Sequence, residues 1–135
     1  MKYAGFKLTK VEAEKFETNP KGNISVNSNF NLGKAKREEV AGSDKNVFGF
    51  EFTYTIKYEE FATLSFKGMV FVELESEDKK IVKELETSEN SKDNDLRKFI
   101  LDVVLAKTHV ESLHLEERLG LPFHIQSPRV KFGEE

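Results

Sequence analysis

The sequence contains no cysteine, so disulfide bonds, thiolate metal sites and a cysteine nucleophile are excluded together. It also contains no apolar run that approaches the roughly 18 residues of a membrane-spanning helix. The first residues alternate polar and apolar side chains, without the continuous apolar segment of a signal peptide. These absences predict a cytoplasmic protein that does not insert into a membrane.

A basic excess is missing as well. The chain has 21 lysine and arginine residues against 24 aspartate and glutamate residues, which gives a net charge of −3. Proteins that bind a phosphate backbone usually carry an excess of positive charge, so we expect no nucleic-acid partner. The length of 135 residues is enough for one hydrophobic core and short for two. A single domain over residues 1–135 is therefore predicted.

Side chains that perform chemistry are present, but not in patterns that catalysis or metal binding needs. His109 and His114 are five residues apart in a predicted helix, roughly 140° around its axis, so they cannot hold one metal ion together. His124 is the third histidine. Glycines occur singly, without a phosphate-binding spacing, and the acidic residues lie in hydrophilic stretches. We expect no catalytic residues, no metal and no cofactor.

Alternating apolar and polar residues dominate the first half of the chain. From Phe48 to Tyr58 every second residue is aromatic or isoleucine, and the residues between them are polar or glycine. This period of two is typical of a strand with one buried face. Residues 61–75 continue the alternation, so 47–58 and 61–75 are predicted to form a long hairpin.

Two weaker strands precede this hairpin. The apolar residues from Ile24 to Leu32 alternate with asparagines, which predicts a strand with one face in water. In the first segment the alternation that includes Phe6 slips near Thr9, where a β-bulge would restore the phase. Together the four segments predict an antiparallel sheet within residues 3–75, with a charged loop at about 34–46.

The sheet is followed by a charged crossover over residues 76–94. Its few apolar residues, Ile81, Val82 and Leu85, can anchor one or two helical turns. The rest of the crossover is polar and charged. We therefore expect little regular structure between the sheet and the next helix.

A long helix is predicted over residues 95–119. Asp93 or Asn94 can cap its beginning, Gly120 can close its end, and the following proline prevents its continuation. An extended tail over 121–133 contains two prolines. The predicted fold class is α+β: a four-stranded antiparallel sheet packed against one long C-terminal helix.

The first half of this helix is apolar nearly all round. One stripe contains five apolar residues, and a second group lies on the other side of the helix. The stripe is Leu96, Phe99, Ile100, Val103 and Val110; the second group is Leu101, Val104 and Leu105. A helix that only covers its own sheet keeps a polar back. We therefore expect a partner subunit on the second face, in a dimer or tetramer, with Leu101, Val104 and Leu105 as interface candidates.

Met69 and Phe71 are the other unusual apolar residues. They lie on the strand face opposite the core set, where their neighbours of the same parity are polar. Two interpretations remain open. The hydrophobic tail or a second subunit covers them, or they line a groove for an extended polypeptide, which flexible methionine and flat aromatic rings can accommodate.

In sequence order these elements resemble the export chaperone SecB: four antiparallel strands, a crossover and a long helix. The resemblance covers about residues 4–132 and is distributed over five short segments. They are Phe6–Leu8, Val26–Phe30, Phe66–Phe71, Leu121–Ile125 and Pro128–Phe132. The chain is similar to a short archaeal or bacterial SecB-like protein that lacks the C-terminal helix of typical SecB.

The resemblance implies an ATP-independent chaperone that binds unfolded or precursor polypeptides in hydrophobic grooves. By matching position, the groove candidates are Phe30, Met69, Phe71, Leu96, Phe99 and Phe123. In SecB the C-terminal helix and tail contribute to docking on the SecA motor, so a SecA-type partner is not implied by the part that matches. A dedicated client and a general export role are both compatible with it.

Two other functions are compatible with the composition. A curved sheet and a helix can enclose an apolar pocket, as in a carrier of small apolar ligands. Alternatively, every apolar face can be covered by self-assembly, as in a structural subunit with no client. Binding of an apolar ligand or of an unfolded protein distinguishes the three.

Overall fold

The structure, a computed structural model, describes residues 1–16, 24–38 and 46–121. Four antiparallel strands form one sheet in the order β1-β4-β3-β2. The elements are β1 (Lys2–Lys15), β2 (Val26–Glu38), β3 (Asn46–Tyr58), β4 (Ala62–Leu74), the 3-10 turn η1 (Ser76–Asp78), α1 (Lys79–Ser88) and α2 (Asn94–Leu119). This arrangement confirms the predicted α+β fold class.

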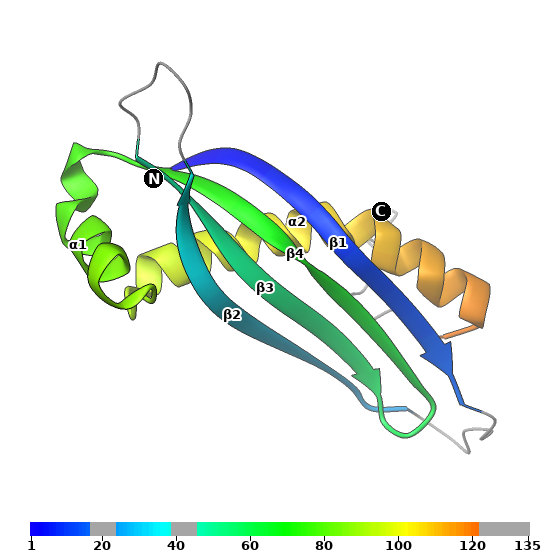
Figure 1. Ribbon diagram of the computed structural model, residues 1–135. Helices are drawn as coiled ribbons and strands as arrows, with labels where there is room; N and C mark the ends of the chain where they lie inside the picture. The colour runs from blue at the N-terminus through cyan, green and yellow to red at the C-terminus, as the bar shows by residue number, and fades with distance from the viewer. Residues whose placement is uncertain (17–23, 39–45, 122–135) are drawn as a thin grey trace, which may run out of the picture.

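The helices lie on one side of the sheet. In Figure 1, α2 passes behind the strands, α1 lies at one end, and no helix of the described residues crosses the face toward the viewer. We call the two sides the helix face and the open face. None of the helices in the described ranges is long and apolar enough to cross a membrane.

The central hairpin builds most of the core. β3 and β4 pair without a register shift from Asn46 opposite Leu74 to Tyr58 opposite Ala62. Because the side-chain period of a strand is two, the predicted alternation places one set of residues on the helix face. The fully buried members are Phe48, Phe50, Phe52, Tyr54, Ile56, Tyr58, Ala62, Leu64, Phe66, Val70, Val72 and Leu74.

The predicted β-bulge in the first strand is confirmed. The register of β1 against β4 shifts between Leu8 and Lys10, and it shifts a second time between Tyr3 and Gly5. Each shift inserts an unpaired residue, which changes the parity of the strand. As a result, Leu8 on one side of the bulge and Val11 on the other both face the helix side.

The second strand is longer than predicted. β2 continues to Glu38 after a register shift between Leu32 and Ala35, so the expectation of a charged loop from residue 34 was wrong for 34–38. Tertiary contacts hold this part of the strand. The backbone N–H of Ala35 donates to the carbonyl of Glu89 at 2.9 Å, and Arg37 pairs with Glu86 of α1. The charges of residues 34–38 do not indicate these contacts, because their partners lie in α1, far away in the sequence.

The crossover contains more regular structure than expected. α1 has ten residues, nearly three turns, and ends at Glu89 in the left-handed region with φ 61°. Ile81 and Leu85, one turn apart, are buried in the core. The three apolar residues of the crossover therefore anchor a full helix rather than one or two turns.

The ends of α2 follow the predicted signals. Asp93 is the N-cap, and its side chain accepts a hydrogen bond from the backbone N–H of Leu96 at 2.9 Å. Gly120 closes the helix in the left-handed conformation with φ 66°. The helix begins at Asn94, one residue before the predicted start, and ends at Leu119.

The buried stripe of α2 is spaced by four residues. Its members are Leu96, Ile100, Val104, Thr108, Ser112 and Glu116. Four residues advance 400° around a helix, so the stripe turns by about 40° at each step and by about 200° along its length. A rotating stripe fits a helix that crosses a twisted sheet.

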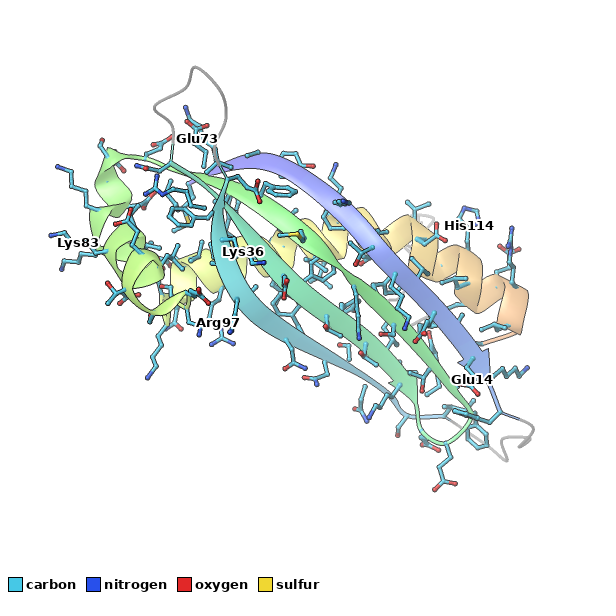
Figure 2. All side chains as sticks on the ribbon, viewed as in Figure 1. Glu14, Lys36, Glu73, Lys83, Arg97 and His114 are labelled. Atoms are coloured by element: carbon cyan, nitrogen blue, oxygen red, sulfur yellow. The ribbon has the colours of Figure 1, made fainter. Side chains whose placement is uncertain are left out.

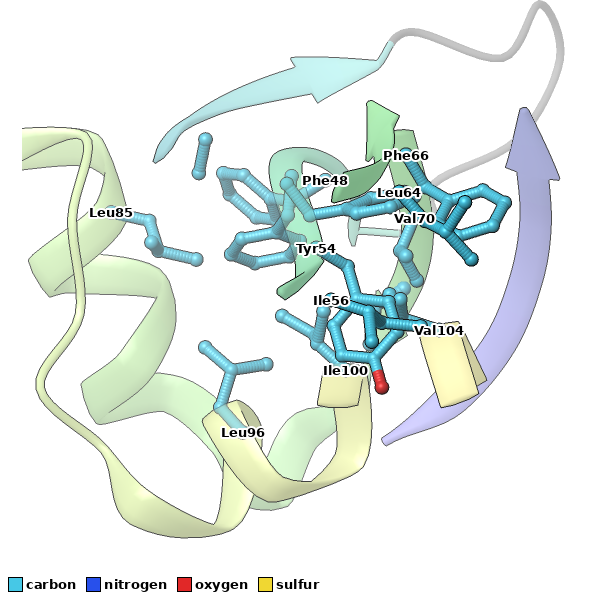
Figure 3. Packing of buried hydrophobic residues seen from close by; sticks show 14 of the residues in the cluster. Phe48, Tyr54, Ile56, Leu64, Phe66, Val70, Leu85, Leu96, Ile100 and Val104 are labelled. Carbon is cyan, nitrogen blue, oxygen red and sulfur yellow. The ribbon is translucent and has the colours of Figure 1, made fainter. Parts of the chain in front are cut away.

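This spacing corrects two predictions. Val104 was an interface candidate and Leu96 a groove candidate, but both side chains are fully buried in the core of their own domain. Figure 3 shows Leu96, Ile100 and Val104 on α2 among the residues of the strands. The physical reason is that the buried residues of α2 recur every four residues, and Val104 is one of them. The average helical period of about 3.6 residues predicts instead a buried stripe that stays on one side of the helix.

Candidate functional site

Met69 and Phe71 lie side by side on the open face of the sheet. Both are half-buried, whereas their neighbours on the same face of β4 are threonine, serine, lysine and glutamate. Side chains opposite one another in antiparallel strands share a face, so the register fixes which residues surround them. Monomeric proteins rarely leave large apolar side chains grouped on a wet surface without a use for them.

Glycine on both neighbouring strands gives Phe71 its position. Phe71 is opposite Gly5 of β1 and opposite Gly49 of β3. A Cβ atom built at Gly49 would lie 2.9 Å from Met69 Cε and 3.0 Å from Phe71 Cε1, and one at Gly5 would lie 3.3 Å from Phe71 Cδ2. The two apolar side chains therefore lie against the backbone of both adjacent strands. We call Met69, Phe71, Gly5 and Gly49 the apolar patch.

A shallow hollow of about 400 Å³ adjoins the apolar patch. All four strands contribute to it, and Met69 lies at its border. Its lining residues are Thr9, Asn31, Leu32, Gly33, Glu51, Phe52, Thr53, Lys67, Gly68 and Met69. The bulge of β1 at Thr9 and the irregularity of β2 after Leu32 both occur at this hollow. Sequence reasoning located the first of these irregularities and missed the second.

Lysines surround the apolar patch. Lys7 is opposite Met69, and Lys10 and Lys67 are opposite each other in the next row. Lys36 is opposite Gly49, in the same row as Phe71. Figure 2 labels Lys36 and Glu73 toward this end of the open face and Glu14 at the other end. The patch is thus apolar at its centre and basic at its border.

The structure separates the residues that sequence matching had grouped into one groove. Met69 and Phe71 lie on the open face, whereas Phe30 and Phe99 pack against the core on the helix face. Leu96 is a core residue, and Phe123 lies outside the described residues. Only Met69 and Phe71 of the six candidates form one accessible cluster in the described ranges.

A second apolar stripe runs along α2; Phe99 and Val103 at its beginning pack partly against the core, whereas Val110 is exposed. It contains residues at alternating intervals of four and three: Phe99, Val103, Ala106, Val110 and Leu113. These positions lie within about 80° around the helix axis. Val110 is 62% exposed. We call this set the outer stripe. The sequence placed Val110 in one stripe with Leu96, and the two lie only about 40° apart around the axis. Leu96 is nevertheless buried and Val110 exposed, because the buried side of α2 rotates along its length.

Leu101 and Leu105, the remaining interface candidates, are half-buried on α2. They lie about 40° apart around the axis, on a different flank of the helix from the outer stripe. Leu105 packs against the core of its own domain, so its burial is explained in part without a partner.

The polar residues beneath the second half of α2 do not form a reactive centre. Tyr58 and Glu116 are both fully buried. Burial raises the pKa of the Tyr58 hydroxyl well above its ordinary value, and the Glu116 carboxylate raises it further. A tyrosine with such a pKa stays protonated at neutral pH. Within residues 1–16, 24–38 and 46–121, no three acidic or histidine side chains come together as metal ligands.

Comparisons of the sequence with protein families and with curated proteins find no match. Comparison of the fold with solved structures finds a SecB-like chaperone. The likeness covers nearly all of both chains: 96% of this chain and 92% of the other. The fold is therefore SecB-like, as the order of the elements in the sequence implied.

The matching structure is Mycobacterium tuberculosis Rv1957, a SecB-like chaperone in complex with a ChAD peptide from the Rv1956 HigA1 antitoxin. The TM-score is 0.50 and the sequence identity is 15%. At this identity the likeness shows the fold alone.

Proposed function

We propose that this protein is an ATP-independent chaperone that binds unfolded or extended segments of other polypeptides and serves a dedicated client. The observation that carries the proposal is the apolar patch on the open face of the sheet. The likeness in fold to a chaperone solved with a peptide supports it. The proposal requires no catalytic residue and no cofactor.

The chemistry of the apolar patch suits varied clients. Burial of apolar surface contributes about 25 cal/mol per Å² removed from water, offset by the ordering of the bound segment. A flexible methionine and a ring that lies against backbone adapt to different side chains. Because the protein would bind non-native chains and not native ones, it would hold them without ATP.

We further propose that the protein self-associates through α2. The four-and-three spacing of the outer stripe is the spacing of helices that pack lengthwise on one another. The small side chain of Ala106 at its centre allows close approach. An oligomer would present several apolar patches to one client chain, and binding at one patch would strengthen binding at the next.

The structure favours this function over a small-ligand carrier. Large side chains, including Phe48, Phe50 and Phe66, fill the helix face of the sheet. A surface hollow of about 480 Å³ between the sheet and α1 contains the apolar Leu74 and Val82. It is otherwise lined by polar and charged residues: Asn46, Glu75, Ser76, Lys79, Lys83 and Glu86. This hollow is open to solvent, whereas a carrier site buries most of the surface of a small apolar ligand.

Aggregation of a chemically unfolded model protein tests the proposal. The purified chain should suppress light scattering at a near-stoichiometric ratio without ATP. The double substitution Met69→Asp/Phe71→Asp should abolish suppression, because two carboxylates cannot be buried against a client without a large desolvation cost. Thr63→Asp, on the same face of β4 but away from the patch, should leave it intact. Far-UV circular dichroism of each variant verifies folding.

Either of two results would contradict the proposal. The chain fails to suppress aggregation, or the double variant suppresses it as well as the unsubstituted chain. The mass of the same samples by light scattering tests self-association. Val110→Asp should lower the mass toward that of one chain, because it places a charge at an exposed position of the outer stripe.

A further inference from the structure

We infer that the segment that docks on the apolar patch carries acidic residues next to its apolar anchor. This inference rests on the proposed function and specifies the chemistry of the client. Its basis is the charge distribution around the patch, which has the opposite sign to that of the whole chain.

The register places four lysines in the three rows that contain and adjoin the patch. These rows are Gly5–Phe71–Gly49–Lys36, Lys7–Met69–Glu51 and Lys10–Lys67–Thr53–Asn31. Directly opposite side chains on neighbouring strands have Cβ atoms about 5 Å apart, so each lysine lies within reach of the patch or of a group bound to it. All four lysines are exposed.

Three of these lysines have no carboxylate within ion-pair distance among the described residues. Lys10 pairs with Glu12 at 2.8 Å, whereas Lys7, Lys36 and Lys67 form no such pair in the described ranges. Glu51 is the one acidic residue of the three rows. The local excess of positive charge is therefore available to a ligand.

Acidic residues limit the basic area at both ends. Glu73 and Glu38 lie in the row before Phe71, and Glu12 and Glu14 lie in the rows after Lys10. A nucleic acid would place its evenly spaced phosphates against these carboxylates. A short acidic stretch of polypeptide beside an apolar side chain fits the distribution better, because the net positive charge is confined to the three rows. Beyond them Lys2 shares its row with Glu73 and Glu38, and Lys57 shares its row with Glu14.

Binding of two synthetic peptides tests the inference. Both carry the same central phenylalanine and leucine residues; one has aspartate and glutamate on each side, the other lysine. Fluorescence anisotropy should show the acidic peptide binding about tenfold more tightly, as about three exposed ion pairs would give. Raising the salt concentration should reduce this difference, because salt screens exposed charges.

Charge reversal identifies the lysines responsible. Lys7→Glu/Lys67→Glu should abolish or reverse the preference for the acidic peptide. Lys57→Glu/Lys80→Glu is the matched control, because it changes the net charge equally at exposed positions outside the three rows. This control should retain the preference.

Several outcomes would overturn the inference. They are equal or reversed affinities of the two peptides, no binding of either, and loss of the preference in both double variants. Equally tight binding of a single-stranded oligonucleotide would overturn it, because the patch would then select negative charge alone. Loss of self-association in Lys7→Glu/Lys67→Glu would identify a second copy as the occupant. The aggregation assay stays independent: suppression that persists in these cases retains the proposed function and rejects only the client's chemistry.

Discussion

The two faces of the sheet are built from the same four strands and have opposite surroundings. The helix face is covered by α2 and α1, and its side chains on β3 and β4 are apolar and buried. The open face alternates with it and is mostly polar, as antiparallel sheets allow. On the helix face an apolar side chain is explained by the core alone. On the open face Met69 and Phe71 lack that explanation, so a function is best sought there.

The largest expected difference between the faces is in stability. Phe66→Ala should lower the free energy of unfolding by about 4 kcal/mol, because it leaves a cavity in a packed core. Met69→Ala, on the open face of the same strand, should lower it by about 1 kcal/mol or less. Urea denaturation followed by circular dichroism measures both. Similar losses for the two variants would show that the open face is part of the core.

An intermediate effect is expected at alkaline pH on the helix face. Burial, then the Glu116 carboxylate, raises the pKa of Tyr58, and burial raises that of Tyr54. Both tyrosines are neutral in the folded and unfolded chain below the unfolded pKa of about 10. Above it the unfolded chain loses protons that the folded chain retains, so stability falls by up to about 1.4 kcal/mol per pH unit for each tyrosine.

Urea denaturation between about pH 8 and pH 11 measures this slope. Tyr58→Phe should reduce the slope while leaving the part due to Tyr54. An unchanged slope in Tyr58→Phe would show that Tyr58 ionises as readily in the folded chain as in the unfolded one.

The smallest expected effect on stability is on the open face. Gly49→Ala places a Cβ 2.9 Å from Met69 Cε, the mobile end of a flexible side chain. The strain of this contact destabilises the folded chain, whereas the lower conformational entropy of the unfolded chain stabilises it. The two effects should nearly cancel, so the free energy of unfolding should change by less than about 1 kcal/mol. Peptide binding should nevertheless weaken about fivefold, a loss near 1 kcal/mol, because Met69 and Phe71 must move.

Thr55→Ala, on the open face of the same strand, is the control for this substitution. It should leave both stability and binding nearly unchanged. If Gly49→Ala binds peptide as well as the unsubstituted chain, the position of the two side chains against the glycines does not matter for binding.

The sheet was predictable because its information is local. The alternation from Phe48 to Tyr58 specified a buried face, and the slip near Thr9 specified a bulge. The end of β2 was not predictable, because Ala35 and Arg37 are held by α1, which is far away in the sequence. The number of helical turns in the crossover was underestimated for a related reason: the burial of Ile81 and Leu85 depends on the sheet they pack against.

The candidate site was predictable in part. The alternation of residues along β4 was enough to predict that Met69 and Phe71 lie on the face opposite the core, among polar residues. Matching by position also selected Leu96, and amphipathicity selected Val104 as an interface residue; both are in the core. When a helix segment is apolar all round, its sequence does not show which side faces the sheet. That side depends on the angle at which α2 crosses the sheet.

The sequence by itself determined the four strands, the side-chain parity of the central hairpin, and the capped ends of the long helix, because these depend on residues a few positions apart. Tertiary structure decided the rest. Strand pairing brought Gly5 and Gly49 to the two sides of Phe71 and placed Lys7 and Lys36 next to the patch. The crossing of α2 over a twisted sheet decided which helix residues are buried. Both depend on register and packing between distant segments, which no local pattern contains.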